Sequence, residues 1–274
     1  MRTQTRIKIK SAMPRPVWNM ISSAYRRNLY SRYKKDMTRH PDSMTVFCPC
    51  YGLKFKEFVK GDYEEYNGYY DLTLFEGVRQ DVCCPVCESL PRHRIEILWC
   101  EEHMDLFQGK EILYFAVERS EKLWMKRKGV KCTTADLFAE ADLKLDIQDT
   151  GLADNSYDVI FCNHVLEHVD DYMKALRELR RILRPGGVLI CSFPVSPDIE
   201  YVDEDPSVTS EEERLKRFGQ CDHVRLFGIN AGIFMEDAGF EVSVIDGKDC
   251  LEEVLPVTAP CKYDINRLFL CRIV

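Results

Sequence analysis

Short apolar runs alternate with segments of helical periodicity in the second half of the chain. Residues 157–162 form an apolar run typical of a buried parallel strand. Asp170 or Asp171 can cap a following helix. The apolar positions of that helix recur at helical spacing: Met173, Leu176, Leu179 and Leu183. Residues 185–187 (Pro-Gly-Gly) end it, and a second apolar run begins at Val188, so the pattern predicts a βαβ unit in a parallel sheet.

Similar patterns extend the prediction to both sides of this unit. Residues 111–116 and 131–135 predict two more strands, and residues 95–107 predict a helix. Residues 92–94 (Arg-His-Arg) are interpreted as the solvated start of that helix, with an orientation toward an active site as the alternative. A helix at 231–238 and strands at 239–245 and 266–274 complete the pattern. Residues 194–218 are polar and irregular, and loops of this length are usually functional.

The composition narrows the class of protein. The 274 residues are 45% hydrophobic and 30% charged, which suits a globular α/β core with a small second module. The sequence has no apolar run of about 18 residues, so we expect no membrane-spanning helix. The first forty residues lack the apolar segment of a secretory signal, and we therefore expect a cytoplasmic protein, with a peripheral membrane location as the alternative.

The net charge of −7 is distributed unevenly along the chain. Residues 1–40 hold eleven Lys or Arg residues and one acid, Asp36, so the rest of the chain is strongly acidic. An acidic body argues against nucleic-acid binding by the main domain. Apolar positions near helical spacing predict a basic amphipathic helix in the N-terminal arm: Val17, Met20, Ile21, Ala24, Tyr25 and Leu29. This arm is a solvated terminus, a segment that contacts a membrane surface, nucleic acid or the acidic body, or an organelle transit peptide.

Thirteen cysteines, an odd number partly scattered through predicted core strands, indicate reduced intracellular thiols and not a disulfide framework. Two groups cluster, Cys48-Pro49-Cys50 and Cys84-Pro85-Val86-Cys87, and two thiolate turns joined by β structure suit a tetrahedral zinc ribbon. The first turn is irregular, because Tyr51 stands where a regular knuckle has its second cysteine. Either Cys50 or Cys83 completes the ligand set, or the thiols are buried without metal. A bound zinc ion would be structural, since so small a module has little core.

The segment from residue 154 to residue 192 resembles class I S-adenosylmethionine-dependent methyltransferases, in the unit that joins their fourth and fifth strands. The resemblance lies in YDVI at 157–160, VLEHV at 165–169 and RILRPGG at 181–187. It implies an α/β fold with a Rossmann-like seven-stranded sheet, whose sixth and seventh strands are antiparallel. It also implies S-adenosylmethionine as the cofactor.

The predicted cofactor-binding half lacks one sequence motif that is usual in that family. The glycine-rich loop that normally follows the first strand is replaced, and its glycine positions hold Ala116, Glu118 and Ser120. Asp136 ends the second predicted strand, where a carboxylate accepts ribose hydroxyls in nucleotide-binding βαβ units. The resemblance places an adenine-reading acid at Asp146, and it implies cofactor contacts at these residues: Phe115, Ala116, Glu118, Asp136, Leu137, Asp146, Ile147, Asn163 and His164.

A more specific resemblance covers residues 45–246. The cysteine module, the run at 88–94 (ESLPRHR), Phe115-Ala116-Val117-Glu118 and the run at 218–228 (FGQCDHVRLFG) are similar to one bacterial subfamily of methyltransferase-domain proteins. That subfamily replaces the glycine loop with a turn of this type, so the resemblance implies that Glu118 binds the cationic α-amino group of the cofactor. The expected organisation is an arm at 1–44, a zinc-ribbon-like module at 45–90 with ligands Cys48, Cys50, Cys84 and Cys87, and a methyltransferase domain at 91–274.

The acceptor side is expected in the insertion after the fifth strand, above the carboxyl ends of the strands. Methyl transfer to an OH or NH group needs a base, and His223 is the first candidate because the pKa of histidine lies near working pH. Acceptor-binding candidates are Gln220, Asp222, Arg225 and His168. The leading function is methyl transfer to a small-molecule or glycan-type acceptor. The alternative is a non-catalytic scaffold protein that binds a partner through its zinc ribbon, which the missing glycines favour.

Overall fold

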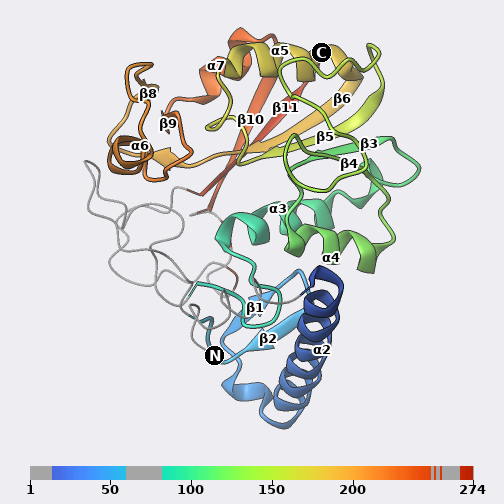
Figure 1. Ribbon diagram of the computed structural model, residues 1–274. Helices are drawn as coiled ribbons and strands as arrows, with labels where there is room; N and C mark the ends of the chain where they lie inside the picture. Colours follow the sequence, from blue (N-terminus) through green and yellow to red (C-terminus); the bar gives the residue numbers. More distant parts are fainter. Residues whose placement is uncertain (1–13, 60–81, 248–249, 251–253, 255–265, 274) are drawn as a thin grey trace.

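The computed structural model describes residues 14–59, 82–247, 250, 254 and 266–273 (Figure 1). The first thirteen residues of the predicted basic arm, with Arg2, Arg6, Lys8 and Lys10, lie outside the described residues, as do residues 60–81 between the two cysteine turns. Within the described part of the chain, no helix is both long and apolar enough to cross a bilayer.

A mostly parallel six-stranded sheet forms the centre of the molecule. Its strand order is β10-β11-β6-β5-β3-β4. The strands span Ile112–Phe115 (β3), Thr133–Ala135 (β4), Tyr157–Asn163 (β5), Leu183–Ser192 (β6), Glu241–Asp246 (β10) and Arg267–Arg272 (β11). β4, β3, β5 and β6 run parallel, whereas β11 pairs antiparallel with both β6 and β10.

Two details of the expected sheet need correction. Seven strands were expected, but the described residues form six; beyond β4 the chain makes a single parallel bridge, between Ala135 and Leu143, which is too short to count as a strand. Both last strands were expected to be antiparallel to the others. Only β11 is, because β10 reverses direction again and runs with the parallel set.

The predicted βαβ unit is confirmed. α5 spans Tyr172–Ile182, and the Asp171 side chain accepts a hydrogen bond from the Lys174 N–H at its start. β6 begins directly after the helix, and its Gly187 lies so close to β5 that a Cβ there would stand 2.9 Å from the Asp158 carbonyl oxygen. The glycine therefore permits the tight return from helix to strand.

Helices cover both faces of the sheet, as the apolar runs predict. Alternate residues of β5 and β6 point to opposite faces. Val159, Phe161, Val188 and Ile190 face α3 (Pro91–Glu102) and α4 (Arg119–Lys128). Ile160, Cys162, Leu189 and Cys191 face α5 and α7 (Gly232–Asp237), which lie on the other side in Figure 1.

The helix predicted at 95–107 starts earlier. α3 begins at Pro91 and is followed by a short 3-10 turn, Met104–Leu106. The interpretation of residues 92–94 as a solvated start is wrong, because Arg94 is fully buried. Its guanidinium donates to the carbonyl oxygens of Val254, Val82 and Ser89 at 2.7, 2.9 and 2.8 Å, and it lies 4.0 Å from the Phe58 ring.

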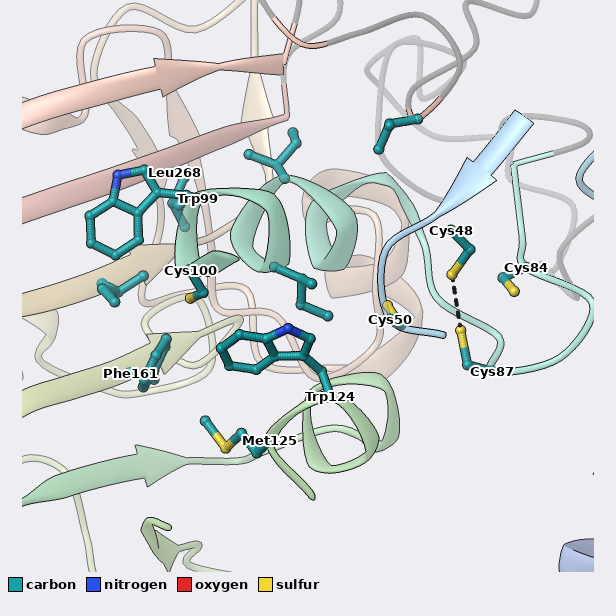
Figure 2. Close-up of a cluster of buried hydrophobic side chains, with 14 of the residues drawn as sticks. Cys48, Cys50, Cys84, Cys87, Trp99, Cys100, Trp124, Met125, Phe161 and Leu268 are labelled. Carbon is teal, nitrogen blue, oxygen red and sulfur yellow. Dashed lines mark hydrogen bonds between the residues drawn. The ribbon is translucent and has the colours of Figure 1, made fainter. Parts of the chain in front are cut away.

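The cysteine module shares its core with α3. A short hairpin, β1 (Val46–Cys48) and β2 (Leu53–Phe55), carries the first cysteine turn. The four predicted ligands belong to the same buried cluster as Ile95, Ile97 and Trp124, and Figure 2 shows them beside α3. The module therefore packs directly against the main sheet's helical layer.

The N-terminal helix is present and longer than the predicted pattern. α2 spans Arg15–Arg39, and a 3-10 turn follows at Pro41–Ser43. Its packed face lies in its second half, where Tyr30 contacts Tyr51 and Tyr33 contacts Phe55 at 5.3 and 5.1 Å between ring centroids. Residues of the predicted apolar face remain exposed on the opposite half: Val17, Met20, Ile21 and Tyr25.

The insertion at 194–218 is more ordered in its backbone than its polar sequence suggests. It holds β7 (Val195–Ser196), β8 (Val202–Glu204) and α6 (Glu211–Phe218), and β7 and β8 pair with β9 (Arg225–Gly228) in a three-stranded sheet. The expectation of an irregular stretch is therefore wrong. Strands of two to four residues are too short to show periodicity in the sequence.

Candidate functional site

Strand register brings several predicted cofactor residues to one edge of the sheet. Phe115 pairs with Ala135 on β4 and with Cys162 on β5. Because parallel strands end at the same edge, Ala116, Asp136 and Asn163 leave the sheet side by side. In open α/β sheets, ligands bind in the crevice outside this carboxyl edge.

The loop after β3 has an unusual backbone at its first position. Ala116 has φ +51°, a left-handed conformation that glycine adopts without strain. Its N–H donates to the Ala135 carbonyl oxygen at 2.9 Å, which ties the loop to β4. Ala116 therefore adopts the left-handed backbone conformation that a glycine would favour at this position. α4 begins three residues later, with Glu118 at the N-cap position.

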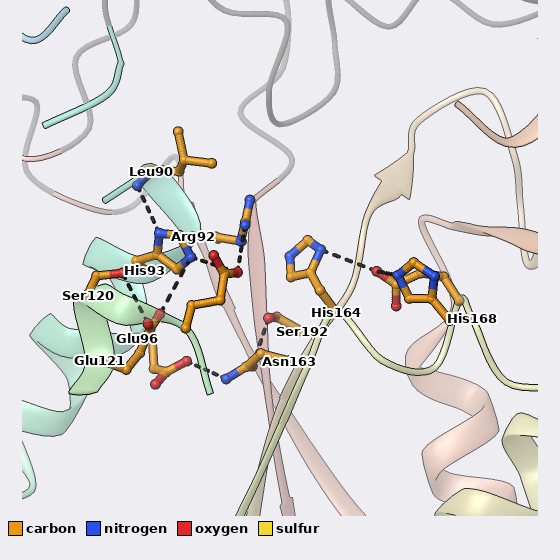
Figure 3. A network of polar contacts seen from close by, with 12 residues as sticks. Leu90, Arg92, His93, Glu96, Ser120, Glu121, Asn163, His164, His168 and Ser192 are labelled. Carbon is orange, nitrogen blue, oxygen red and sulfur yellow. Dashed lines mark hydrogen bonds and ion pairs between the residues drawn. The ribbon is translucent and has the colours of Figure 1, made fainter. Parts of the chain in front are cut away.

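Glu118 lies between two basic side chains of α3. Its carboxylate is 2.7 Å from Arg92 Nη2 and 3.0 Å from His93 Nε2. Figure 3 shows Arg92 and His93 near each other. Burial alone would raise the pKa of Glu118, but Arg92 and His93 outweigh it and hold the pKa far below the ordinary value for a glutamate. The carboxylate thus stays ionised, and about half of its side chain is exposed to solvent.

Asp136 begins a turn with exposed apolar residues. One carboxylate oxygen accepts hydrogen bonds from the N–H groups of Phe138 and Ala139 at 2.7 and 2.6 Å. Phe138 is 88% exposed and Leu137 is 47% exposed. Two exposed apolar side chains next to an acid at the carboxyl edge would suit a ligand with a flat apolar base and polar hydroxyls.

Asp146 follows the bridge that Leu143 makes with Ala135. Its Oδ1 accepts from the backbone N–H of Gln148 at 2.8 Å, and the Gln148 side-chain oxygen accepts from the Asp171 N–H at 2.8 Å. The acid is thereby fixed to the start of α5. The neighbouring Ile147 is 4% exposed and belongs to the core on the α5 side.

The Asn163 side chain belongs to a buried polar network beneath the edge. Its amide donates to Glu96 at 2.5 Å and its carbonyl accepts from Ser192 at 2.8 Å (Figure 3). The amide also donates to the Tyr114 hydroxyl at 3.0 Å. Burial and the nearby Glu121 raise the pKa of Glu96 well above its ordinary value. The Asn163 side chain therefore links α3, β3 and β6 beneath the carboxyl edge. His164, the next residue, lines a narrow crevice with Arg92 and Phe193.

A second cluster forms around Glu167, on the segment between β5 and α5. Glu167 is 1% exposed, and its Oε1 lies 3.2 Å from His164 Nδ1 and 4.0 Å from His168 Nε2. His223 comes from the segment before β9, and its ring is 4.7 Å from that of His168. Burial lowers the pKa of His223, which favours the neutral imidazole.

The other predicted acceptor-side residues divide into two groups. Gln220 and Asp222 are exposed and bonded to each other at 3.1 Å, and Asp222 lies 3.5 Å from His168. Arg225 is buried and donates to Glu204 and to the carbonyl oxygens of Leu166, Val169 and Asp170. Its guanidinium thus fastens the insertion to the loop that carries Glu167.

The two cysteine turns are structurally alike. The Gly52 N–H donates to Cys48 O and the Glu88 N–H donates to Cys84 O, both at 2.9 Å, and both donors have φ near +65°. The thiol sulfurs of Cys48, Cys84 and Cys87 lie within 4.8 Å of one another, with Cys48 and Cys87 3.5 Å apart (Figure 2). Cys50 is fully buried but does not belong to this group of three; its burial, with Cys48 and Cys87 nearby, raises the pKa of its thiol. Cys83 instead directs its thiol to the Cys84 carbonyl oxygen at 3.8 Å.

Three contributors to these clusters are not among the predicted site residues. Glu167 was noticed only as part of the run VLEHV, although a charged residue inside an apolar run is itself a signal of a buried partner. Glu96 and Tyr114 gave no such signal, because glutamate in a helix and tyrosine in a strand are ordinary.

Comparison with known proteins gives one family match. Residues 114–191 match the family model described as "Methyltransferase domain", and this range runs from β3 to β6. The matched segment includes the Ala116 loop, Asp136, Asp146 and Glu167.

Curated relatives match over parts of their length. The demethylmenaquinone methyltransferase of Listeria monocytogenes serotype 4a (strain HCC23) is 32% identical over 119 residues, which are 43% of this chain and 45% of that protein. The reducing polyketide synthase Preu2 of Preussia isomera is 44% identical over 55 residues, 20% of this chain and 2% of that protein. The chain thus spans less than half the length of the curated relatives described here.

Solved structures match the chain at low sequence identity. The 1,6-didemethyltoxoflavin-N1-methyltransferase of Burkholderia thailandensis, solved with S-adenosylhomocysteine, has a TM-score of 0.45 at 13% identity, covering 67% of this chain and 79% of that one. The [4+2]-cyclase SpnF has a TM-score of 0.48 at 13% identity, covering 78% and 90%.

Proposed function

We propose that this protein transfers the methyl group of S-adenosylmethionine to a small-molecule acceptor. The observation that carries the proposal is the carboxyl edge of β3, β4 and β5, where Ala116, Asp136 and Asn163 meet within the segment that matches the methyltransferase domain. The cofactor supplies an electrophilic methyl group on its sulfonium sulfur. The protein's own residues bind and orient it and accept the acceptor's proton.

The residues at this edge suit the two ends of the cofactor. Asp136 can accept the ribose hydroxyls through the carboxylate oxygen that its own turn does not use. The exposed Leu137 and Phe138 offer apolar surface to the adenine ring, and Asp146 and Ile147 are assigned to its far side. Phe115, Asn163 and His164 complete the proposed cofactor set.

The methionine end of the cofactor carries one positive and one negative charge. Glu118 is ionised and half exposed, so we assign it to the α-ammonium group. Arg92, 2.7 Å from Glu118, offers the opposite charge to the α-carboxylate. An ion pair of this kind explains how binding can proceed without the glycine-rich loop.

For the acceptor side we assign proton removal to His223. Its Nδ1 faces the Phe218 carbonyl oxygen at 3.0 Å, so Nδ1 carries the proton and the lone pair is on Nε2. His168 is assigned to acceptor binding together with the exposed Gln220 and Asp222. Arg225 is assigned a positioning role, because its guanidinium already bonds three backbone carbonyls.

We also propose that Cys48, Cys50, Cys84 and Cys87 hold a structural zinc ion. Cys48, Cys84 and Cys87 form a group of buried thiols, and the full burial of Cys50 supports it as the fourth ligand over Cys83, whose thiol faces the Cys84 carbonyl oxygen. A glycan-type acceptor, and membrane contact through the exposed apolar residues of α2, stay predictions.

A non-catalytic scaffold remains the second candidate, favoured by the replaced glycines and by the burial of His223. A transfer assay with methyl-labelled S-adenosylmethionine and small-molecule extracts separates the two. If the protein is a methyltransferase, the wild type should form labelled product. His223→Ala should form none, and it should bind the cofactor as the wild type does. A folded, cofactor-binding wild type that labels nothing in extracts of its host would support the scaffold. Full turnover in His223→Ala would remove His223 from the mechanism.

A further inference from the structure

We propose that Glu167, His168 and His223 form a binding site for a divalent transition-metal ion such as Zn²⁺. The ligand atoms of these three side chains lie within 4.8 Å of one another. Glu167 and His168 follow β5, whereas His223 precedes β9, so the fold brings them together from distant parts of the chain. The site is separate from the cysteine cluster, and metal binding to it does not depend on methyl transfer.

Both histidines leave Nε2 available to bind a metal ion. His223 Nδ1 lies 3.0 Å from the Phe218 carbonyl oxygen, and His168 Nδ1 lies 3.2 Å from the Asp222 carbonyl oxygen. A carbonyl oxygen can only accept a hydrogen bond, so each Nδ1 carries the proton and each Nε2 is unprotonated in the neutral ring. Metal-binding histidines in proteins are held in this way, with the second ring nitrogen donating to a backbone carbonyl or carboxylate.

The carboxylate of Glu167 is an unsatisfied buried group. The side chain is 1% exposed, and among the described residues neither oxygen accepts a well-aligned hydrogen bond. A buried carboxylate with His164 as its one near partner in the described part of the chain is costly, so a positive charge beside it would stabilise the site. The His164 ring, 3.2 Å away, can supply it only as an imidazolium. A metal ion would supply the positive charge while leaving every imidazole neutral.

The distances require a small adjustment. Nitrogen and oxygen ligands about 2.0–2.1 Å from a tetrahedral zinc ion are roughly 3.4 Å apart. The Glu167 Oε1 to His168 Nε2 distance is 4.0 Å and no pair of ligand atoms is more than 4.8 Å apart, so closure by about 0.6 Å in the first pair and by at most about 1.4 Å in any pair would complete the contacts. Three protein ligands also leave a coordination position open, as metal sites that bind substrate or water do.

The donor set indicates the class of metal. Two imidazoles and one carboxylate suit zinc, iron and other first-row divalent ions, whereas calcium and magnesium prefer sites made of oxygen atoms. A metal here would occupy the same Nε2 lone pair of His223 that the proposed function assigns to proton removal. The two roles are therefore alternatives, and metal titration distinguishes them without any turnover measurement.

The test is a titration of the full-length, chelator-treated protein with Co²⁺, followed by visible absorption. Cobalt bound by thiolates shows sulfur-to-metal charge transfer, whereas cobalt bound by nitrogen and oxygen shows d–d bands without it. We expect the wild type to bind one cobalt ion of the second kind in addition to any thiolate-bound ion. Glu167→Gln, which preserves shape, and His168→Ala should each weaken this binding at least tenfold. His40→Ala, at an exposed histidine, should leave it unchanged.

The cobalt titration separates this site from the cysteine site. Cys50→Ser should alter only the charge-transfer component. If Glu167→Gln fails to fold, His168→Ala decides, because His168 is 30% exposed and its truncation leaves little cavity. A wild type that shows only the thiolate component, or variants that retain the nitrogen-and-oxygen component at full affinity, would overturn the proposal and leave protonated His164 as the partner of Glu167.

Discussion

Arg94 links the cysteine module to the main domain, and its removal should be costly. The guanidinium is fully buried at the start of α3 and donates to three backbone carbonyls, those of Val254, Val82 and Ser89. The side chain also covers the Phe58 ring at 4.0 Å. Arg94→Met keeps much of the apolar contact and removes all three hydrogen bonds.

The magnitude follows from which acceptors lose their partners. Ser89 O still accepts from the Cys84 N–H at 3.0 Å, whereas Val82 O and Val254 O lose the donors described here. Each buried acceptor left unsatisfied costs about 1–3 kcal/mol. Since the methionine avoids burying a charge, we expect a net loss near the middle of that sum, about 4 kcal/mol.

The assay is urea unfolding followed by tryptophan fluorescence. The expected result is a lower midpoint at an unchanged slope, because stability changes without a change in exposed surface. Lys216→Met is the matched control, because it removes a cation from an exposed pair with Glu212 and should leave the midpoint where it is. A loss below about 1 kcal/mol for Arg94→Met would refute the reasoning, since the two carbonyls would then have found other donors.

Three further predictions concern charge, metal and cofactor. Arg181 and Thr150 hold the pKa of Glu178 at about 2, so the stability it contributes is complete above its ordinary value of 4.5 and is lost as pH falls toward 2. Glu178→Gln should flatten the acid limb of the stability curve in that window, and an unaltered limb would contradict the assignment. Cys50→Ser should release zinc, measured by mass spectrometry, whereas Cys83→Ser should retain it; the reverse pattern would exchange the two ligands. Glu118→Ala should weaken S-adenosylmethionine binding at least tenfold in equilibrium dialysis, and unchanged affinity would remove Glu118 from the site.

The central βαβ unit could be predicted because several local signals agree there. The apolar run before Asn163, the cap at Asp171 and the glycines before Val188 all indicate the same elements, and the structure has them. The carboxyl-edge residues Ala116 and Asp136 followed from the same strand order.

The remaining features depend on contacts that sequence periodicity does not encode. Arg94 is polar and lies at a helix start, which normally indicates solvent, but the cysteine module covers it. The choice between Cys50 and Cys83 depends on where each thiol lies, because Cys50 is fully buried whereas the Cys83 thiol faces the Cys84 carbonyl oxygen. The grouping of Glu167 with His223 required the insertion to fold back over the loop after β5, which Arg225 secures.

The central claim is that the carboxyl edge around Asp136 binds S-adenosylmethionine, and isothermal titration tests it most directly. We expect one-to-one binding of S-adenosylmethionine and S-adenosylhomocysteine by the wild type, with no binding of NADH. Asp136→Asn should weaken binding at least tenfold, about 1.4 kcal/mol, while Asp142→Asn, which removes the same charge from an exposed acid on the same loop, should not. Absence of binding to a folded, zinc-loaded sample, or equal affinity in Asp136→Asn, would contradict the account.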